Sequence, residues 1–299
     1  MRSFISRKLS DVFVDFEQEL SSMDRFCELK GISFDWGHVP DYDNIHIQQL
    51  YLLRYFPAYL VEYYLIYRKL ISYDFLNHFK VFSLGCGAYL DFYGLFYALQ
   101  DHGTAEQAAS FSYKGLDKTK WRYKEDLGVS HCHFVNAHIN QWNSLDADDY
   151  NVIILPKSIG ELSERTFKHL QTMLLHSNFT ENNIVLISSI MQQHSPTDMC
   201  RFETIANVLT ANLGFKNLDN NRTYFHIRDA GNGFGLSNCC EDFYYPDEVK
   251  LSLENLLDRC PKFRKQKESC EDDCSDILNR NPILTASHIQ FQINRFTRE

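Results

Sequence analysis

Residues 80–91 read KVFSLGCGAYLD, and this stretch decides the fold class. A short apolar run, Lys80–Leu84, is followed at once by Gly85, Cys86 and Gly87, and a second apolar run begins at Leu90. The first run has the length of a buried strand and the second that of a helix. Two closely spaced glycines let the backbone turn tightly and approach a ligand, and the helix that follows presents unpaired N–H groups to it. The stretch therefore predicts a strand, a turn and a helix with a ligand site at the turn.

Beyond this stretch, short apolar strands alternate with helices. The predicted strands cover residues 80–84, 110–116, 133–135, 151–155, 183–188, 223–227 and about 288–296, and the predicted helices cover residues 90–99, 118–125, 161–175, 197–213 and 246–257. This alternation predicts βαβ units with helices on both faces of the sheet. Because the last strand follows a long excursion, we expect it to be an antiparallel edge strand. The fold class is α/β, a doubly wound and mostly parallel seven-stranded sheet.

The first 78 residues are predicted to be a helical extension. Residues 7–29 have apolar side chains at helical spacing, and a second helical region covers residues 45–72, where Pro57 predicts a kink or two shorter helices. Residues 79–299 are predicted to form the α/β domain, with an acidic, Cys-containing insertion at about 239–282.

An acid stands at the end of the second predicted strand. Residues 113–117 read YKGLD, and a carboxylate at Asp117 can accept two hydrogen bonds from a ribose diol. This segment and the glycine turn resemble the first two motifs of class I S-adenosylmethionine-dependent methyltransferases, whose fold is Rossmann-like. The resemblance implies S-adenosylmethionine as cofactor, with Gly85, Cys86 and Gly87 along its methionine part and Asp117 on its ribose hydroxyls.

The resemblance continues through the next two predicted strands. Asn136 and Ala137 stand where the family usually has an acid or amide near the adenine, and Pro156 follows the fourth strand. The loop after that strand normally faces the methyl group. Three of its residues are therefore candidates for contacts with the methyl acceptor: Lys157, Ser158 and Glu161.

Two positions depart from the family pattern. Ser83 stands where the family usually has an acid, and Tyr89 stands where a third glycine often follows. The first change removes a hydrogen bond that orients the glycine turn, and the second crowds the amino-acid end of the site. Asp91 is a cofactor-binding candidate because it is placed to compensate for either change.

Other interpretations of the turn remain open. A nicotinamide dinucleotide domain needs a third glycine at the position of Leu90, and Asp117 lies 30 residues beyond Gly87, which is longer than the dinucleotide spacing. A strand-to-helix turn without any cofactor is the simplest alternative. A degenerate methyltransferase-fold protein that acts as a ribosome- or protein-binding partner is another.

Residues 54–59, RYFPAY, are faintly similar to the helix that precedes the fold in methyltransferase-like proteins of the small ribosomal subunit. This similarity implies that Arg54 and Tyr59 form a lid over substrate or cofactor, with Arg54 meeting a carboxylate. An aromatic helix that packs on the edge of the sheet is the simpler interpretation.

The composition limits the classes of partner and the cellular location that we expect for this chain. The formal net charge of −9 disfavours nucleic acid, and the most apolar stretch, residues 51–71, contains four charged residues, so no membrane span is expected. Nine Cys residues without a signal peptide indicate a cytoplasmic protein with reduced thiols. A structural zinc is the alternative for the Cys residues of the tail, which are Cys239, Cys240, Cys260, Cys270 and Cys274.

The methyl acceptor is not identified by any motif. The loop after the fourth strand lacks the Asp/Asn-Pro-Pro-aromatic sequence of amino-methylating DNA enzymes. Together with the acidic charge, this favours a small molecule or a protein as acceptor over nucleic acid.

Overall fold

The computed structural model describes residues 1–33, 39–145, 150–191, 195–219, 225–227, 234–235, 245–265, 273–286 and 289–298. The chain divides into two compact units. Unit 1 comprises Met1–Val61, Trp121–Tyr123 and Asn232–Ala286, and unit 2 comprises Glu62–Lys120, Lys124–Gly231 and Ser287–Glu299.

Unit 2 contains the sheet. Its strands are β1 (Lys80–Leu84), β2 (Ser112–Asp117), β3 (Cys132–Asn136), β4 (Val152–Pro156), β5 (Asn183–Ser189), β6 (Lys216–Asn217), β7 (Phe225–Ile227) and β10 (Ile289–Thr297). Its helices are the second part of α2 (Ile45–Ile71) and α3 (Leu90–His102), α4 (Ala105–Ser110), η3 (Ile139–Gln141), α5 (Glu164–Leu175) and α6 (Ser195–Leu213).

The strand order is β3-β2-β1-β4-β5-β10-β6, and β7 also pairs with β10. The pairs among β1 to β5 are parallel, whereas β10 runs antiparallel to β5. In a doubly wound sheet of this kind, ligands bind beyond the carboxyl ends of the strands where the order reverses, here at β1 and β4. The topology confirms the predicted fold class, a doubly wound and mostly parallel Rossmann-like sheet.

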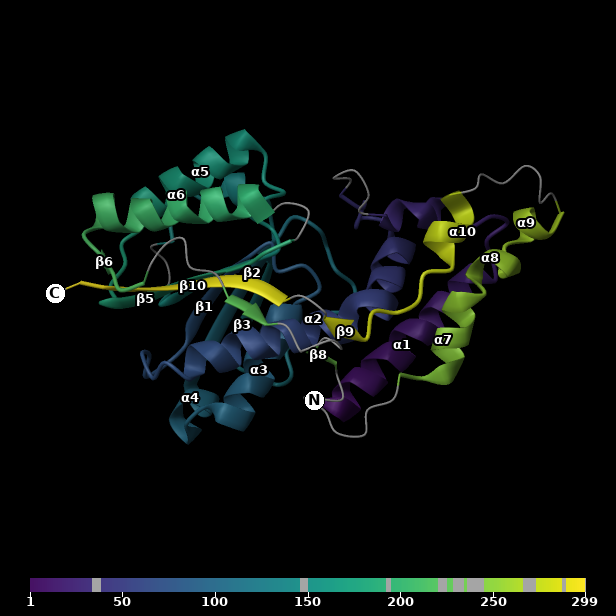
Figure 1. Ribbon diagram of the computed structural model, residues 1–299, viewed down its shortest axis with the longest axis horizontal. Coiled ribbons are helices and arrows are strands. Elements are labelled where there is room, and N and C mark those ends of the chain that lie inside the picture. The colour runs from purple at the N-terminus through teal and green to yellow at the C-terminus, as the bar shows by residue number, and fades with distance from the viewer. Residues whose placement is uncertain are drawn as a thin grey trace. The chain divides into compact units, whose positions relative to one another are not determined.

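Helices cover both faces of this sheet, with α5 and α6 on one side and α3 on the other (Figure 1). On the α5/α6 side, Phe82, Ile153 and Leu186 of the strands share a buried cluster with Leu170 and Phe202 of the helices. Successive side chains of a strand point to opposite faces of the sheet. Because helices cover both faces here, both sets of side chains are mostly apolar.

On the opposite face, α3 approaches the second part of α2 closely. A Cβ at Gly94 would lie 2.5 Å from the Cβ of Tyr63. The contact requires glycine at this position of α3, because any side chain would force the two helices apart.

Several predicted elements differ from the structure. The antiparallel strand β10 is not at the edge, because β6 and β7 pair with it on its outer side. The two-residue strand β6 was missed because a strand that short leaves no periodic signal. No helix forms over residues 118–125, where the backbone N–H of Thr119 is bound by the Asp117 side chain instead. Local hydrogen bonds to Asp side chains compete with helix formation.

The N-terminal helices also differ from expectation. Helix α1 covers Arg2–Leu20, and a short 3-10 helix, η1 (Cys27–Ile32), follows it, where one helix over residues 7–29 was predicted. The hydroxyls of Ser21 and Ser22 bond backbone carbonyls of α1 and so mark its end. Helix α2 continues through Pro57, so two separate helices do not form.

Unit 1 is mainly helical. It contains α1, η1, the first part of α2, α7 (Asp247–Glu254), α8 (Leu256–Arg259), α9 (Pro261–Lys265), α10 (Asp273–Leu278) and the strand pair β8 (Phe234–Gly235) and β9 (Thr285–Ala286).

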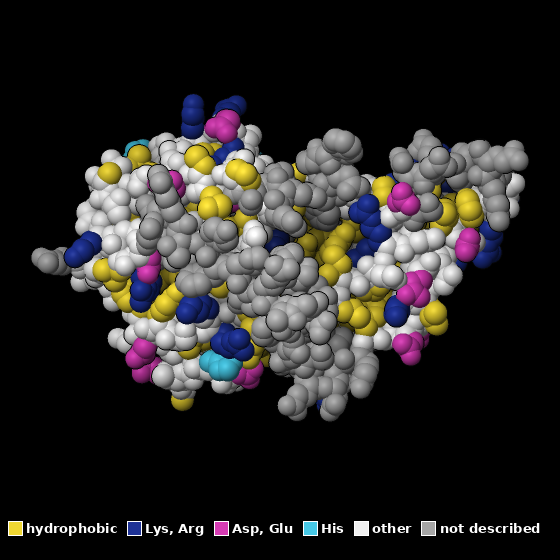
Figure 2. Space-filling view, in the orientation of Figure 1, with side chains coloured by type: hydrophobic (Ala, Val, Ile, Leu, Met, Phe, Trp, Pro, Cys, Tyr) yellow, Lys and Arg dark blue, Asp and Glu magenta, His cyan; other side chains and the backbone are white. Residues whose placement is uncertain are grey.

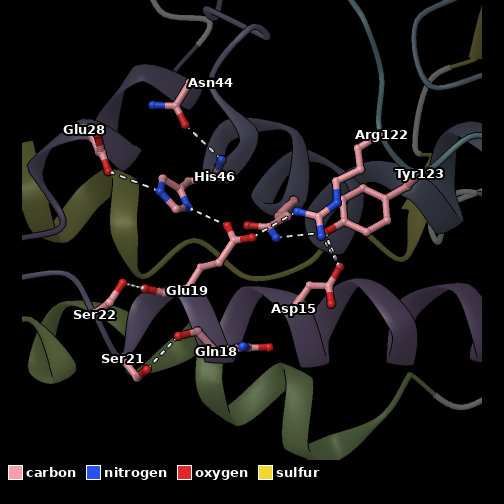
Figure 3. A network of polar contacts seen from close by, with 11 residues as sticks. Asp15, Gln18, Glu19, Ser21, Ser22, Glu28, Asn44, His46, Arg122 and Tyr123 are labelled. Carbon is pink, nitrogen blue, oxygen red and sulfur yellow. Dashed lines mark hydrogen bonds and ion pairs between the residues drawn. The ribbon is translucent and has the colours of Figure 1, made fainter.

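A polar network joins α1, α2 and the short segment Trp121–Tyr123 within unit 1 (Figure 3). Arg122 lies 3.1 Å from Glu19 and 3.3 Å from Asp15, and the Tyr123 hydroxyl donates to Asp15. The ring of His46 lies 3.2 Å from the other oxygen of Glu19. Much of this network is solvent-exposed, so its ion pairs stabilise the unit only slightly.

The division into units does not coincide with the predicted boundaries. It falls inside α2, after Val61, and groups residues 232–286 with the N-terminal helices. The helical extension up to residue 78 and the acidic, Cys-containing insertion at about 239–282 stay predictions. None of the helices in the described part of the chain is both long and apolar enough to cross a membrane.

Candidate functional site

The glycine turn after β1 is held against the end of β2. Gly85 and Gly87 both have positive φ, +73° and +52°. The backbone N–H groups of Gly85 and Cys86 donate to the carbonyl of Leu116, at 2.8 and 3.3 Å. A Cβ at Gly85 would lie 2.6 Å from the Cβ of Ser158. The backbone conformation and the closeness of the loop after β4 therefore both require glycine at this position.

Asp117 at the end of β2 faces the same turn. Its Oδ2 accepts a hydrogen bond from the backbone N–H of Gly87 at 2.8 Å, and its Oδ1 accepts one from Thr119 at 2.8 Å. The structure brings together the glycines and the acid that the sequence singled out.

The end of β3 supports the backbone around Asp117. The amide nitrogen of the Asn136 side chain donates to the carbonyls of Asp117 and Lys118, at 3.1 and 2.7 Å, and the Ala137 N–H donates to Asp117 at 3.0 Å. Asn136 is exposed at this edge. Asn136 and Ala137 thus lie beside Asp117, and their predicted place near the adenine stays a prediction.

Asp91 is fully buried beneath the turn. Both of its carboxylate oxygens accept a hydrogen bond from the Tyr113 hydroxyl, at 3.0 and 2.9 Å. Burial raises the pKa of Asp91 to about 7, against the lowering effect of the hydrogen bonds it accepts. The side chain packs between α3 and β2 and does not reach the surface of the turn.

The other two side chains of the turn are also inside the protein. Cys86 lies over Gly115 of β2, where a Cβ would come within 2.7 Å of its sulfur. Burial raises the pKa of the Cys86 thiol, which keeps it protonated and unreactive. Tyr89, whose φ is +66°, stacks on Phe134 of β3 with ring centroids 3.8 Å apart.

The loop after β4 is tied to three neighbouring elements. The Ser158 hydroxyl donates to the carbonyl of Leu84 at 2.6 Å, next to the glycine turn. The Lys157 ammonium lies 2.8 Å from the buried carboxylate of Glu62 on α2, which also accepts a hydrogen bond from Ser189 at 2.5 Å. Pro156 ends β4 and pairs with Ser189 of β5. Neither Glu62 nor Ser189 was singled out by the sequence, because no local pattern indicates a partner so distant in the chain.

Glu161 lies in the same loop, and its side chain is exposed. Although the residue as a whole is exposed, the protein atoms around its carboxylate displace water and raise its pKa to about 7; the negative charge of Asp198 adds to the effect, Lys118 opposes it and Asp117 adds a smaller contribution. The backbone of Glu161 lies in the loop between β4 and α5, at the carboxyl edge of the sheet.

Arg201 of α6 binds the backbone of this loop, a role that the sequence did not reveal. Its Nη1 donates to the carbonyls of Ile159, Gly160 and Leu162, at 2.8, 3.2 and 2.7 Å. Its Nη2 donates to Glu164 at 2.5 Å. A lone arginine in an amphipathic helix gives no sequence signal for such a role.

The two lid candidates belong to unit 1. Arg54 is buried, its Nη2 donates to the carbonyl of Leu278 at 2.6 Å, and burial lowers its pKa to about 10. Tyr59 stacks on Tyr55 with ring centroids 5.6 Å apart. Tyr59 is therefore part of the aromatic packing along α2, and Arg54 is buried and bonded within unit 1.

The described residues contain no cluster of three or more His, Cys, Asp and Glu side chains that could hold a metal ion. Of the tail cysteines, Cys260 and Cys274 are buried free thiols, and Cys239, Cys240 and Cys270 lie outside the described residues.

Charges of both signs are interspersed on the surface. On the face shown in Figure 2, Lys and Arg side chains lie among Asp and Glu side chains. Nucleic-acid binding draws on a concentrated positive surface. The described residues on this face offer no such surface.

No protein-family model and no curated protein matches the sequence. Among solved structures, the chain is similar to the plantazolicin methyltransferase BpumL in complex with a pentazolic desmethylPZN analog and SAH, at 13% identity and a TM-score of 0.43, covering 98% of this chain and 100% of that one. It is also similar to a cyclopropane-fatty-acyl-phospholipid synthase-like protein from Lactobacillus casei, at 12% identity and a TM-score of 0.38, covering 80% and 92%. Because the sequence identities and TM-scores are this low, any assignment of function rests on the geometry of the site and not on these structures.

Proposed function

We propose that this chain is an S-adenosylmethionine-dependent methyltransferase that acts on a small molecule or a protein. One observation carries the proposal: the Asp117 carboxylate lies at the carboxyl end of β2 and binds the Gly87 N–H at 2.8 Å. An acid and a glycine turn joined in this way, in a sheet of this strand order, form the pair of motifs that the sequence resemblance implies for cofactor binding.

The residues of the turn fit the cofactor. Gly85 and Gly87 leave backbone without side chains before the start of α3, and a carboxylate such as that of Asp117 can accept hydrogen bonds from the two hydroxyls of a ribose. Asn136, Ala137 and Pro156 complete the proposed cofactor-binding set. When bound, the cofactor supplies a methyl group on an already activated leaving group, so the protein's tasks are to position the acceptor and exclude water.

Glu161 is the proposed base. A nitrogen or oxygen acceptor loses a proton on methylation, and a carboxylate whose pKa is about 7 accepts a proton efficiently near neutral pH. Lys157 is held by Glu62 and Ser158 by Leu84, so we propose that these two shape the acceptor side of the site without exchanging protons.

The remaining candidates are assigned supporting roles. Cys86 and Asp91 are buried, and we propose that they hold the turn against β2 through packing and the Tyr113 hydroxyl. Arg54 and Tyr59 stay a proposed lid, and the cytoplasmic location and the choice between a small-molecule and a protein acceptor stay predictions from the sequence.

Calorimetric titration with S-adenosylmethionine tests the proposal. We expect micromolar binding by the wild-type protein and its loss in Asp117→Ala. Asp101→Ala is the matched control, since this acid of α3 only accepts a hydrogen bond from Tyr64. Binding should persist in this control.

A degenerate methyltransferase-fold protein that binds a ribosome or protein partner is the alternative. The observation in its favour is Tyr89, a bulky residue at a position of positive φ where the family often has glycine. Absence of binding by well-folded wild-type protein would support this alternative and contradict the proposed enzyme.

A further inference from the structure

The backbone around Glu161 is held by donors that come from outside its loop. The loop between β4 and α5 turns at Ser158, whose carbonyl accepts the N–H of Glu161 at 3.1 Å. The carbonyls on both sides of Glu161 point toward α6, where Arg201 binds those of Ile159, Gly160 and Leu162. Buried carbonyls need donors, and here a single guanidinium supplies them.

Arg201 is built for this contact. Only 8% of its surface is exposed, its guanidinium lies 4.9 Å from the centroid of the Phe167 ring, and its second terminal nitrogen is paired with Glu164. A planar guanidinium with several fixed donors can bind more than one carbonyl at once, which an ammonium does with less geometric precision.

The same face of α6 carries a second contact with the edge of the sheet. Asp198 lies three residues before Arg201, and residues at this spacing share a helix face. Its carboxylate accepts the backbone N–H of Met191, after β5, at 3.0 Å, and its charge acts on Glu161. The start of α6 therefore organises the loops after both β4 and β5.

From these contacts we infer that Arg201 is a positioning residue, which fixes the loop after β4 so that the Glu161 carboxylate is presented at the cofactor side of the sheet. The inference rests on the proposed function only for the identity of the cofactor. The attachment of the loop to Arg201 can be tested without any ligand.

The first test is hydrogen exchange of the backbone amides of residues 157–163. Arg201→Met removes the donors but keeps the apolar stem, and we expect exchange in this loop to become at least about tenfold faster. Arg201→Lys should give an intermediate rate, because lysine restores some of the hydrogen bonds. Arg295→Met is the control: it breaks the pairing with Asp219 elsewhere in unit 2 and should leave the loop unchanged.

The second test uses charge. S-adenosylmethionine carries a positive sulfonium that S-adenosylhomocysteine lacks. The affinity for S-adenosylmethionine divided by that for S-adenosylhomocysteine therefore increases when a negative group lies nearby. The wild-type ratio should rise between pH 6 and pH 8 as Glu161 ionises, within the field of Asp198, Asp117 and Lys118. At pH 8, Glu161→Gln and Arg201→Met should both lower the ratio by about threefold to fivefold, since exposed charges interact weakly.

The outcomes separate the two proposals. If the wild-type protein binds neither compound, the proposed function is wrong, and the exchange rates still decide whether Arg201 fixes the loop. If Arg201→Met keeps wild-type exchange in residues 157–163, or keeps the wild-type affinity ratio, Arg201 is not a positioning residue. A ratio unchanged in Glu161→Gln would also overturn the inference, because Glu161 would not lie at the cofactor.

Discussion

Two buried arginines lie in contrasting surroundings in the two units. Arg201 in unit 2 donates to three carbonyls and a carboxylate. Arg54 in unit 1 is more deeply buried, yet within the described part of the chain its Nε and Nη1 have no hydrogen-bond partner, and only Nη2 is bonded, to Leu278. The same side chain therefore binds several carbonyls of a loop in unit 2, whereas among the described residues it makes a single side-chain hydrogen bond in unit 1.

The contrast reflects how many hydrogen-bond acceptors the surrounding backbone offers to a buried guanidinium in each unit. At the carboxyl edge of the sheet, loops from β1, β2 and β4 converge, and each has backbone groups that only a neighbouring loop or helix can satisfy. A buried charge there has partners because the loops supply them. Along α2, backbone groups bond within the helix and leave few acceptors for a guanidinium.

The largest expected effect on the free energy of unfolding concerns Asp91. Both of its carboxylate oxygens accept from the neutral Tyr113 hydroxyl, so it tests whether such a partner stabilises a buried carboxylate in unit 2. Its pKa in the folded protein is about 7, above the ordinary value of 3.8. Between these values the folded state holds a proton that the unfolded state has lost, so the free energy of unfolding falls as pH rises from 4 to 7 and then levels off. The three-unit difference corresponds to roughly 4 kcal/mol.

Asp91→Asn should remove this slope while keeping an acceptor for the Tyr113 hydroxyl. Urea unfolding of both proteins at several pH values between 4 and 8 measures the effect. The variant should gain stability relative to wild type as pH increases. A difference that stays constant with pH would show that Asp91 is ionised throughout and better paired than its burial suggests.

Arg201→Met should have the next largest effect. The variant leaves three loop carbonyls without their donor, and we expect a loss of about 3 kcal/mol in the free energy of unfolding. Arg295→Met, at a partly exposed pair with Asp219, should lose only about 1 kcal/mol. Equal losses in urea unfolding would mean that the loop contacts of Arg201 add little to the stability of the edge.

The loops at the carboxyl ends of the strands could be predicted only where a short stretch of sequence determines their structure. The Gly85 and Gly87 turn and Asp117 follow directly from strands that end in them, and the strand alternation predicted the sheet. The helix expected over residues 118–125 does not form, because backbone N–H groups there donate to the side-chain oxygens of Asp117 and Gln48 instead of to helical carbonyls.

Partners from distant parts of the chain could not be predicted. Glu62 meets Lys157, and Arg201 meets the carbonyls of Ile159, Gly160 and Leu162, across long separations in sequence. No feature of the sequence indicated that the Asp91 side chain is buried and bonded to Tyr113 of β2, although its role in cofactor binding stays a prediction. Spacing along one segment does not reveal which face a neighbouring element covers.

Gly85→Ala tests how crowded the edge of the sheet is. Gly85 and Gly128 have nearly the same φ, +73° and +77°, but a Cβ at Gly85 would meet Ser158 whereas nothing lies within 4 Å at Gly128. Alanine at either position should cost about 1 kcal/mol for the backbone conformation, and at Gly85 about 2 kcal/mol more for the clash. Thermal unfolding and cofactor titration measure both, and only Gly85→Ala should lose binding.

Arg54→Met should have the smallest effect, although Arg54 is the more deeply buried of the two arginines. The variant removes a desolvated charge and loses one hydrogen bond to Leu278, so the opposing contributions should leave the free energy of unfolding within about 1 kcal/mol of wild type. Arg54→Ala should be worse by about 2 kcal/mol, because it also removes the apolar stem from a packed site. Urea unfolding of the two variants beside Arg201→Met measures the contrast directly. A loss in Arg54→Met as large as that in Arg201→Met would mean that the Arg54 guanidinium is fully paired in solution, and the two arginines would then stabilise their units in the same way.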